Sequence, residues 1–209
     1  MRVRVLSRLE VETGAAEGAD AVISIRSPSN GHEPDLTAAL IQATRGESAR
    51  LLRLVFDDVG LAGYGISIAP TLSQMQDAIE FGRAIVDGRH LFDGPNSDPL
   101  IVVHCEMGRS RSSAIALALL ADHYGPGREH DAVNDLLRAG IEGRMHPNPM
   151  AVLHADVCLL RYGRLDAALA QLSPHYVLWR RYWTQAALDP IGHAQLLTRV
   201  RYRRKQRSG

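Results

Sequence analysis

The sequence predicts an α/β fold, with a central and mostly parallel sheet of about four or five strands flanked by helices. Short apolar or alternating segments, which predict strands, take turns along the chain with longer segments of helical periodicity. One short segment, 100–103, is wholly apolar, as expected for a strand that is buried on both faces of a parallel sheet. The chain has 209 residues, of which 45% are hydrophobic, so it can bury a sizeable core.

In the first part of the chain, the pattern predicts three strands and one helix. Residues 2–7 alternate between apolar and polar side chains, and residues 21–26 are rich in β-branched side chains. The turn-forming sequence Ser-Pro-Ser-Asn-Gly ends the second strand, and a short helix is expected over 35–44. A third strand is predicted over 51–56, followed by a glycine-rich loop.

The second part of the chain carries mainly helical signals. Thr71 and Gln74 have the spacing of a capping box, and Gly88 is expected to end the helix that begins there. Segment 113–124 is apolar nearly all round, which predicts a buried central helix. Further helices are expected around 132–137, over 148–160 and 165–172, and once or twice after Ser173.

The length suggests one domain with an appendage, which we place at 1–172 and 173–209, the second being a helical extension with a basic tail. The tail segment 199–207 holds six basic residues, so residues 1–198 carry 18 basic and 23 acidic groups, a net charge of −5. Such an acidic body is not typical of a nucleic-acid-binding domain. Contact of the basic tail with nucleic acid or a membrane is therefore not expected.

Three observations predict a cytoplasmic protein. The longest apolar run, 114–121, is far shorter than the roughly 20 residues of a membrane helix, and the N-terminus has no apolar stretch of signal-peptide length. The two cysteines, Cys105 and Cys158, cannot build a disulfide framework, which fits a reducing compartment. Cys158 is interpreted as a core residue rather than as a redox partner of Cys105.

The segment between the buried strand and the buried helix reads His-Cys-Glu-Met-Gly-Arg-Ser-Arg-Ser, residues 104–112. A loop that leaves a strand and opens a helix points successive backbone N–H groups inward and forms an anion-binding nest. Cys105 begins this loop, so we expect the pKa of its thiol to lie below the free value of about 8.5. The guanidinium of Arg111 can hold two oxygens of a tetrahedral anion, while Gly108 lets the backbone turn closely. A thiolate nucleophile in such a cradle suits a phosphate ester.

The remaining loop residues have supporting roles in this interpretation. Ser112 can offer its hydroxyl to the departing thiolate, and His104 can hydrogen-bond the loop and hold the cysteine in place. The substrate phosphate is expected to contact the inner loop residues, which are Glu106, Met107, Gly108, Arg109 and Ser110.

This segment resembles the signature of the cysteine-based protein tyrosine and dual-specificity phosphatases, His-Cys-x-x-Gly-x-x-Arg-Ser/Thr. Its fixed positions are all matched, by His104, Cys105, Gly108, Arg111 and Ser112. The resemblance extends over about residues 20–172. It implies a phosphatase-like fold, a Cys105 thiophosphate intermediate, and no cofactor or metal ion.

In the dual-specificity branch, the general acid is an aspartate just past an earlier strand. Asp57 and Asp58 both fit, and Asp58 is favoured because the second aspartate is the acid in relatives with a Phe-Asp-Asp run. The alternative is that both only cap the strand. Asp93 and Asp98 are rejected because they precede strand 100–103, at the other end of the sheet.

The turn before the helix at 148–160 also resembles this branch, where Pro-Asn recurs. Asn148 is interpreted as a structural helix cap, and contact with the phosphate-binding loop is the less favoured alternative. The histidines show no metal-ligand spacing, so no metal is assigned.

The leading hypothesis is a metal-independent phosphomonoesterase acting on phosphotyrosine, or with dual specificity on phosphorylated proteins. Phosphoinositides, nucleotides and RNA ends remain alternative substrates, although Glu106 is expected to repel polyanionic headgroups. A phosphate-binding pseudophosphatase and a sulfurtransferase are the weaker alternatives, since Cys105, Arg111 and a candidate acid are all present.

Overall fold

The computed structural model describes residues 1–93, 98–139 and 145–197. The predicted α/β class is confirmed: the described strands form one four-stranded, all-parallel sheet in the order β1-β4-β2-β3. The strands are β1 (Arg2–Ser7), β2 (Ala21–Arg26), β3 (Leu51–Val55) and β4 (Leu100–Cys105). The basic segment 199–207 lies outside the described residues, as does Gly140, which we predict to end the helix around 132–137.

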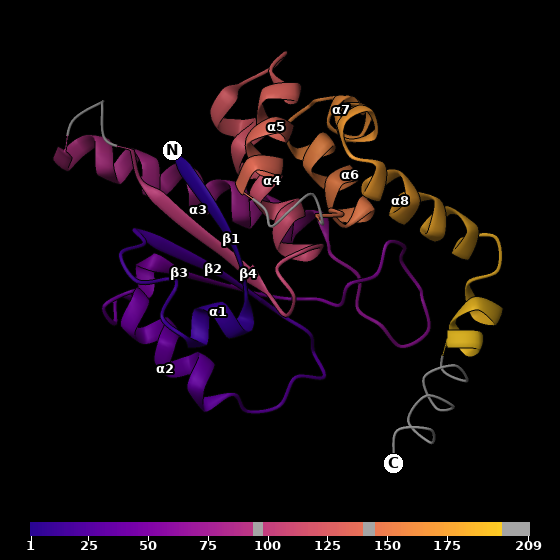
Figure 1. The fold of residues 1–209 in the computed structure, drawn as a ribbon, viewed down its shortest axis with the longest axis horizontal. Coiled ribbons are helices and arrows are strands. Elements are labelled where there is room, and N and C mark those ends of the chain that lie inside the picture. The colour runs from indigo at the N-terminus through magenta and orange to yellow at the C-terminus, as the bar shows by residue number, and fades with distance from the viewer. Residues whose placement is uncertain (94–97, 140–144, 198–209) are drawn as a thin grey trace.

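Helices cover both faces of the sheet (Figure 1). One face carries α1 (Arg8–Glu12) and α2 (Pro34–Ala43). The other face carries the larger group, which comprises α3 (Leu72–Asp93), α4 (Arg111–Tyr124), α5 (Glu129–Ala139), α6 (Pro149–Cys158) and α7 (Arg164–Leu172). As predicted, helices follow Ser173: α8 (Pro174–Ala186) and a helical stretch over 190–197. A 3₁₀ turn, η1 (Ser48–Arg50), precedes β3.

Strand β4 owes its central position to its apolar sequence. Ile101 and Val103 face the core under α3 to α7, whereas Val102 faces the smaller core under α1 and α2. Every residue of β4 is buried, because neighbours cover both faces and both edges. The loop that follows β4 therefore emerges at the middle of the carboxyl edge of the sheet, and α4 returns through the centre of the larger core.

Two local predictions were wrong or incomplete. Helix α3 runs through Gly88 to Asp93, because Gly88 does not adopt the left-handed conformation that ends a helix. Helix α1 was not predicted, since five residues with Val11 as the one buried side chain give no periodicity. Its signal was the Ser-x-x-Glu capping box, in which Ser7 and Glu10 cap each other's backbone.

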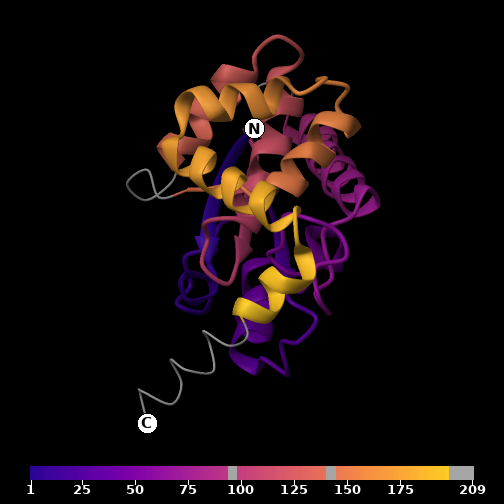
Figure 2. The same ribbon diagram turned by 90° about the vertical axis from the view of Figure 1, so that its right-hand side faces the viewer.

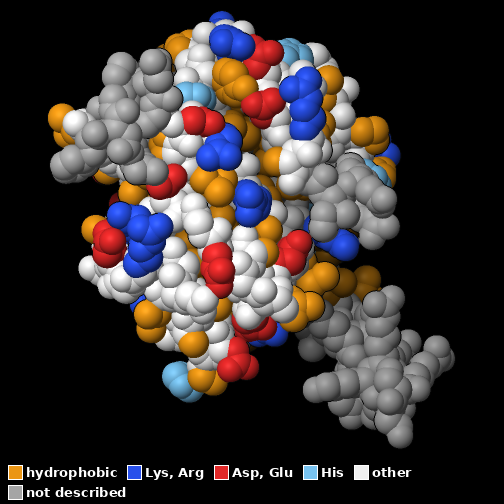
Figure 3. Space-filling view, turned by 60° about the vertical axis from the view of Figure 1, so that its left-hand side comes forward, with side chains coloured by type: hydrophobic (Ala, Val, Ile, Leu, Met, Phe, Trp, Pro, Cys, Tyr) orange, Lys and Arg blue, Asp and Glu red, His pale blue; other side chains and the backbone are white. Residues whose placement is uncertain are grey.

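The surface carries mixed charges on the face seen in Figure 3, where acidic and basic side chains are interspersed rather than gathered by sign. None of the helices in the described ranges combines the length and apolar character needed to span a bilayer.

Candidate active site

The loop 105–110, called here the phosphate loop, is pressed against the end of β1. Gly108 has a left-handed φ of 66°. A Cβ at this position would lie 2.8 Å from the carbonyl carbon of Leu6 and 2.8 Å from the backbone nitrogen of Ser7. The Arg8 backbone N–H also donates to the Glu106 carbonyl at 3.3 Å. Glycine is thus required twice at position 108, for its φ and for its lack of a Cβ.

We expect Gly108→Ala to destabilise the fold and to impair oxyanion binding, because the alanine needs both a strained φ and a shift of β1. The strain alone costs about 1–3 kcal/mol, measurable by urea unfolding. Gly163→Ala is the matched control, since Gly163 has a similar φ of 82° but open space around its Cβ position. Equal losses in the two variants would contradict the importance of the β1 contact.

Cys105 and Ser112 meet as predicted. Cys105 is the last residue of β4 and is 3% exposed, and its Sγ lies 3.1 Å from the Ser112 hydroxyl oxygen. Ser112 is fully buried in the first turn of α4. The sulfur therefore lies beside a helix N-terminus, where unpaired N–H groups and the helix dipole favour negative charge.

Arg111 opens α4 and is 6% exposed. Its Nη1 donates to the Ser27 hydroxyl at 2.9 Å and to the Phe56 carbonyl at 3.0 Å, so the guanidinium is anchored on the ends of β2 and β3. Its buried Nε makes no hydrogen bond to a described residue. Such a donor is costly to leave unpaired, and a bound oxyanion would satisfy it.

The structure separates the two candidate acids. Asp57 Oδ2 accepts the Ile68 backbone N–H at 2.9 Å, so this carboxylate closes the base of the loop between β3 and α3. Asp58 Oδ1 instead accepts the Ser110 hydroxyl at 2.7 Å, inside the phosphate loop. Of these two aspartates, Asp58 is the one whose carboxylate reaches that loop. Asp98 pairs with the N-terminal amine and Arg2, at the amino ends of β1 and β4.

Asn148 connects three parts of the site. Its Oδ1 caps α6 by accepting the N–H groups of Met150 and Ala151, as predicted. Its Nδ2 donates to Asp58 Oδ1 at 2.9 Å, and its backbone N–H donates to the Ser110 carbonyl at 3.1 Å. The less favoured alternative, contact with the phosphate loop, is thus present together with the cap.

His104 lies directly under the phosphate loop. The ring is 1% exposed, and its hydrogen-bonding contact is with the backbone of Cys105, where the loop begins. Burial lowers the pKa of His104 to about 4, an effect that the neighbouring backbone of Cys105 offsets only in part. His104 therefore packs under the loop as a neutral ring.

This buried ring predicts a loss of stability in mild acid. The unfolded chain protonates His104 below its ordinary pKa of 6.5, whereas the folded protein does so only near 4. Stability is therefore fully present above pH 6.5 and falls by roughly 3 kcal/mol as the pH drops toward 4. Urea unfolding at pH 7 and pH 4.5 checks this, with His104→Leu as the comparison. An equal acid-induced loss in both proteins would contradict it.

The other predicted loop residues lie at different depths. Glu106 and Met107 are exposed at the rim, Gly108 and Arg109 are half-buried, and Ser110 is buried. The charge of Glu106 is not isolated, since its Oε1 lies 3.6 Å from Arg8 Nη2.

Sequence reasoning missed a charge network beside this rim. Arg8 and Arg26 both pair with Glu33, at 3.1 and 2.7 Å. Arg8 follows β1, Arg26 ends β2, and Glu33 precedes α2. Because the carboxyl ends of parallel strands lie at one edge of a sheet, the predicted parallel sheet could have indicated that these residues lie close together. Within the described ranges, no group of three or more His, Cys, Asp or Glu side chains could hold a metal ion.

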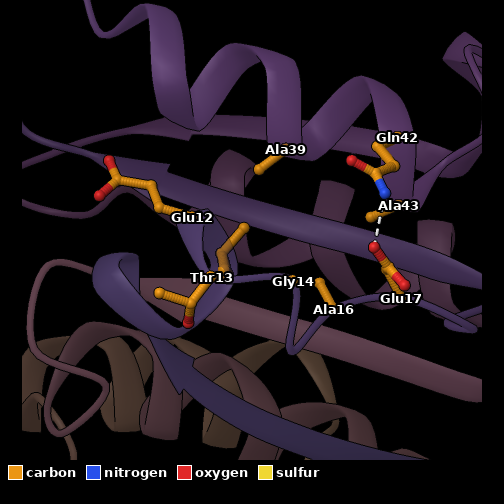
Figure 4. Close-up of a pocket in the computed structure, with 9 residues that line it drawn as sticks. Glu12, Thr13, Gly14, Ala16, Glu17, Ala39, Gln42 and Ala43 are labelled. Atoms are coloured by element: carbon orange, nitrogen blue, oxygen red, sulfur yellow. Dashed lines mark hydrogen bonds between the residues drawn. The ribbon is translucent and has the colours of Figure 1, made fainter.

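A separate pocket of about 270 Å³ lies between α1 and α2 (Figure 4). Figure 4 shows Glu12, Glu17 and Gln42 at its margin, with Glu17 accepting a hydrogen bond from the Gln42 amide. Its lining contains no cysteine, histidine or arginine, so it offers neither a nucleophile nor a cation for a phosphate ester.

No family model and no curated protein matches the chain. Among solved structures, the chain is similar to human DUSP28, with 18% identity over 81% of this chain and 94% of that one and a TM-score of 0.49. It is similar to Tk-PTP in the active form, with 17% identity, 77% and 93% coverage and a TM-score of 0.48. It is also similar to PTPMT1 in complex with PI(5)P, with 16% identity, 82% and 95% coverage and a TM-score of 0.46. Similarity at these identities concerns the fold.

Proposed function

We propose that the chain is a metal-independent phosphomonoesterase of the tyrosine or dual-specificity type, with residues 1–172 as its catalytic domain and Cys105 as its nucleophile. One observation carries the proposal. The Asp58 carboxylate is hydrogen-bonded to Ser110, in the same loop that Cys105 begins and Arg111 follows. A candidate acid, a thiol and a guanidinium from separate segments thus meet at one helix N-terminus.

In the first step, the Cys105 thiolate attacks the phosphorus of the bound ester and forms an S–P bond. The free donors of Arg111 and the loop N–H groups hold the equatorial oxygens, which carry the charge of the transition state. The bond from phosphorus to the leaving oxygen breaks, and protonated Asp58 gives that oxygen its proton. The products are the free alcohol or phenol and the thiophosphate on Cys105.

In the second step, the Asp58 carboxylate takes a proton from water, and the resulting hydroxide attacks phosphorus. The S–P bond breaks and inorganic phosphate leaves. The Ser112 hydroxyl lies within hydrogen-bond reach of the departing sulfur and can stabilise the thiolate. Asp58 has regained its proton, so the enzyme is ready for another ester.

Phosphotyrosine in a protein is the proposed substrate, with dual specificity as its extension, and the proposed setting is the cytoplasm. Arg8 at the rim pairs with Glu106 and Glu33, which offset its charge, so this arginine offers little attraction for a polyphosphorylated headgroup. Both cysteines are free thiols, which fits a reducing compartment.

Hydrolysis of 4-nitrophenyl phosphate in the presence of excess chelator tests this function. We expect full activity, because Arg111 and the loop N–H groups supply the charge that a metal would otherwise provide. Activity that disappears with chelator and returns with a divalent cation would contradict the mechanism. Oxyanion binding without turnover would instead identify a phosphate-binding pseudophosphatase.

A further inference from the structure

The loop that follows Asp58 is covered by the helices at the end of the chain (Figures 1 and 2). A Cβ placed on Gly60 would lie 2.3 Å from Cγ of Trp183 in α8, so the indole ring rests directly on the Gly60 backbone. Gly60 is two residues past Asp58. The contact can therefore restrict the movement of the backbone next to Asp58, the candidate acid.

A second contact reaches the middle of the same loop. The Tyr64 hydroxyl and His193 Nδ1 are hydrogen-bonded at 2.6 Å, and the Tyr64 ring meets Trp183 edge-on with centroids 5.1 Å apart. Val59, Tyr64, Trp183 and Ala186 form a small buried cluster of their own. The loop is thus packed on the C-terminal helices.

The sequence of this loop makes such support necessary. Gly63 and Gly65 both have positive φ, and glycine loses the most conformational freedom when it is fixed. The hydrogen bonds of Asp57 with Ile68 close the base of the loop but do not hold its middle. The middle is held by Trp183 and His193.

The same helix also contacts the other side of the site. The Trp179 ring lies edge-on to His146, with centroids 5.2 Å apart, and the His146 backbone N–H donates to the Arg109 carbonyl at 3.1 Å. Helix α8 therefore contacts both the loop that follows Asp58 and the segment around His146, which is hydrogen-bonded to the phosphate loop.

We propose that residues 174–197 act as a clamp that holds Asp58 against the phosphate loop, with Trp183 and His193 as positioning residues. The inference rests on the proposed function, in which Asp58 must lie within hydrogen-bond reach of the leaving oxygen. A misplacement of about 1 Å in such a group can cost on the order of 10²-fold in rate. Proton transfer from Asp58 therefore depends on the clamp, although the clamp lies outside the phosphate loop in the sequence.

The test compares Trp183→Leu and His193→Phe with wild type in the full-length chain. His175→Phe is the matched control, because His175 is exposed at the start of α8, outside the cluster. Turnover is measured with a phosphotyrosine peptide, whose leaving group needs a proton, and with 4-nitrophenyl phosphate, whose leaving group needs it far less. Amide hydrogen exchange over 59–67 reports on the loop without requiring any activity.

We expect Trp183→Leu to slow thiophosphate formation from the peptide, measured as kcat/KM, by about tenfold or more, and His193→Phe by a smaller factor. The kcat/KM for 4-nitrophenyl phosphate should change little, exchange over 59–67 should quicken in both variants, and His175→Phe should match wild type. An equal fall in kcat/KM with both substrates, or faster exchange without a change in the ratio of the two kcat/KM values, would overturn the proposal.

Two further outcomes are distinguishable. If Trp183→Leu does not fold, His193→Phe decides alone, since it retains a ring and removes the hydrogen bond to Tyr64. If wild type hydrolyses neither substrate, the proposed function fails, whereas unchanged exchange in both variants shows that the clamp itself is absent.

Discussion

Cys105→Ser is expected to abolish turnover, by a factor on the order of 10⁴ or more, while the fold and oxyanion binding remain. A serine hydroxyl stays protonated in this setting and is a far weaker nucleophile than a thiolate. The substitution is nearly isosteric, and the contact of Sγ with the Ser112 hydroxyl is one that a serine oxygen can also make. Steady-state hydrolysis of 4-nitrophenyl phosphate, with thermal stabilisation by inorganic phosphate, measures both effects.

Cys158→Ser provides the control for this experiment. Cys158 is also a free thiol, but it lies on α6, where its Sγ contacts the Leu72 carbonyl rather than the phosphate loop. Burial raises the pKa of the Cys158 thiol, so it is not a competing nucleophile at neutral pH. Near-normal turnover by the Cys105 variant, or loss of turnover by the Cys158 variant, would refute covalent catalysis at Cys105.

Asp58→Asn is expected to lower turnover of a phosphotyrosine peptide by roughly 10²–10⁴-fold, the range of general acid–base catalysis. The amide oxygen can still accept from Ser110, so the loop should keep its place, but the amide has no proton to give to the leaving oxygen. Formation of the thiophosphate from 4-nitrophenyl phosphate should suffer much less, because 4-nitrophenolate is already a good leaving group. The decisive measurement is therefore the ratio of the rates of thiophosphate formation from the peptide and from 4-nitrophenyl phosphate.

Asp57→Asn is the matched control for Asp58→Asn. Its amide oxygen can still accept the Ile68 N–H, so the base of the loop should persist and the leaving-group dependence should equal that of wild type. A leaving-group effect at Asp57 but not at Asp58 would exchange the two roles. No effect at either position would mean that the acid lies elsewhere in the chain.

The sequence predicted those features whose signals are local. The apolar run of β4, the nine residues after it and the all-round apolar helix α4 are contiguous, so they could be interpreted together as strand, loop and helix. Asn148 followed by Pro149 likewise predicted the cap and first turn of α6. The strand order, and the choice of Asp58 over Asp57 by contact, needed the tertiary structure.

What could not be predicted depends on contacts between distant segments. Asn148 looked like a cap because one side-chain oxygen suffices for that role, and its amide was free to donate to Asp58, 90 residues away. The aromatic residues of α8 indicated only that this helix packs against the domain. The sequence could not show that Trp183 contacts Gly60, because glycine has no side chain that would mark a contact. The sequence also gave no measure of how deeply His104 is buried, because that depends on the strands and helices that cover both faces of β4.

The pairing of β1 with β4 has a consequence for how the protein assembles. Ser7 lies in register with Cys105, and Gly108 closes down on the Leu6–Ser7 peptide. The contact that supports the phosphate loop therefore joins two segments that are far apart in the sequence. Bringing these segments together costs loop-closure entropy before the contact can stabilise the fold. We therefore expect the phosphate loop to reach its final position late in folding, after β2, β3 and the helices between them have formed.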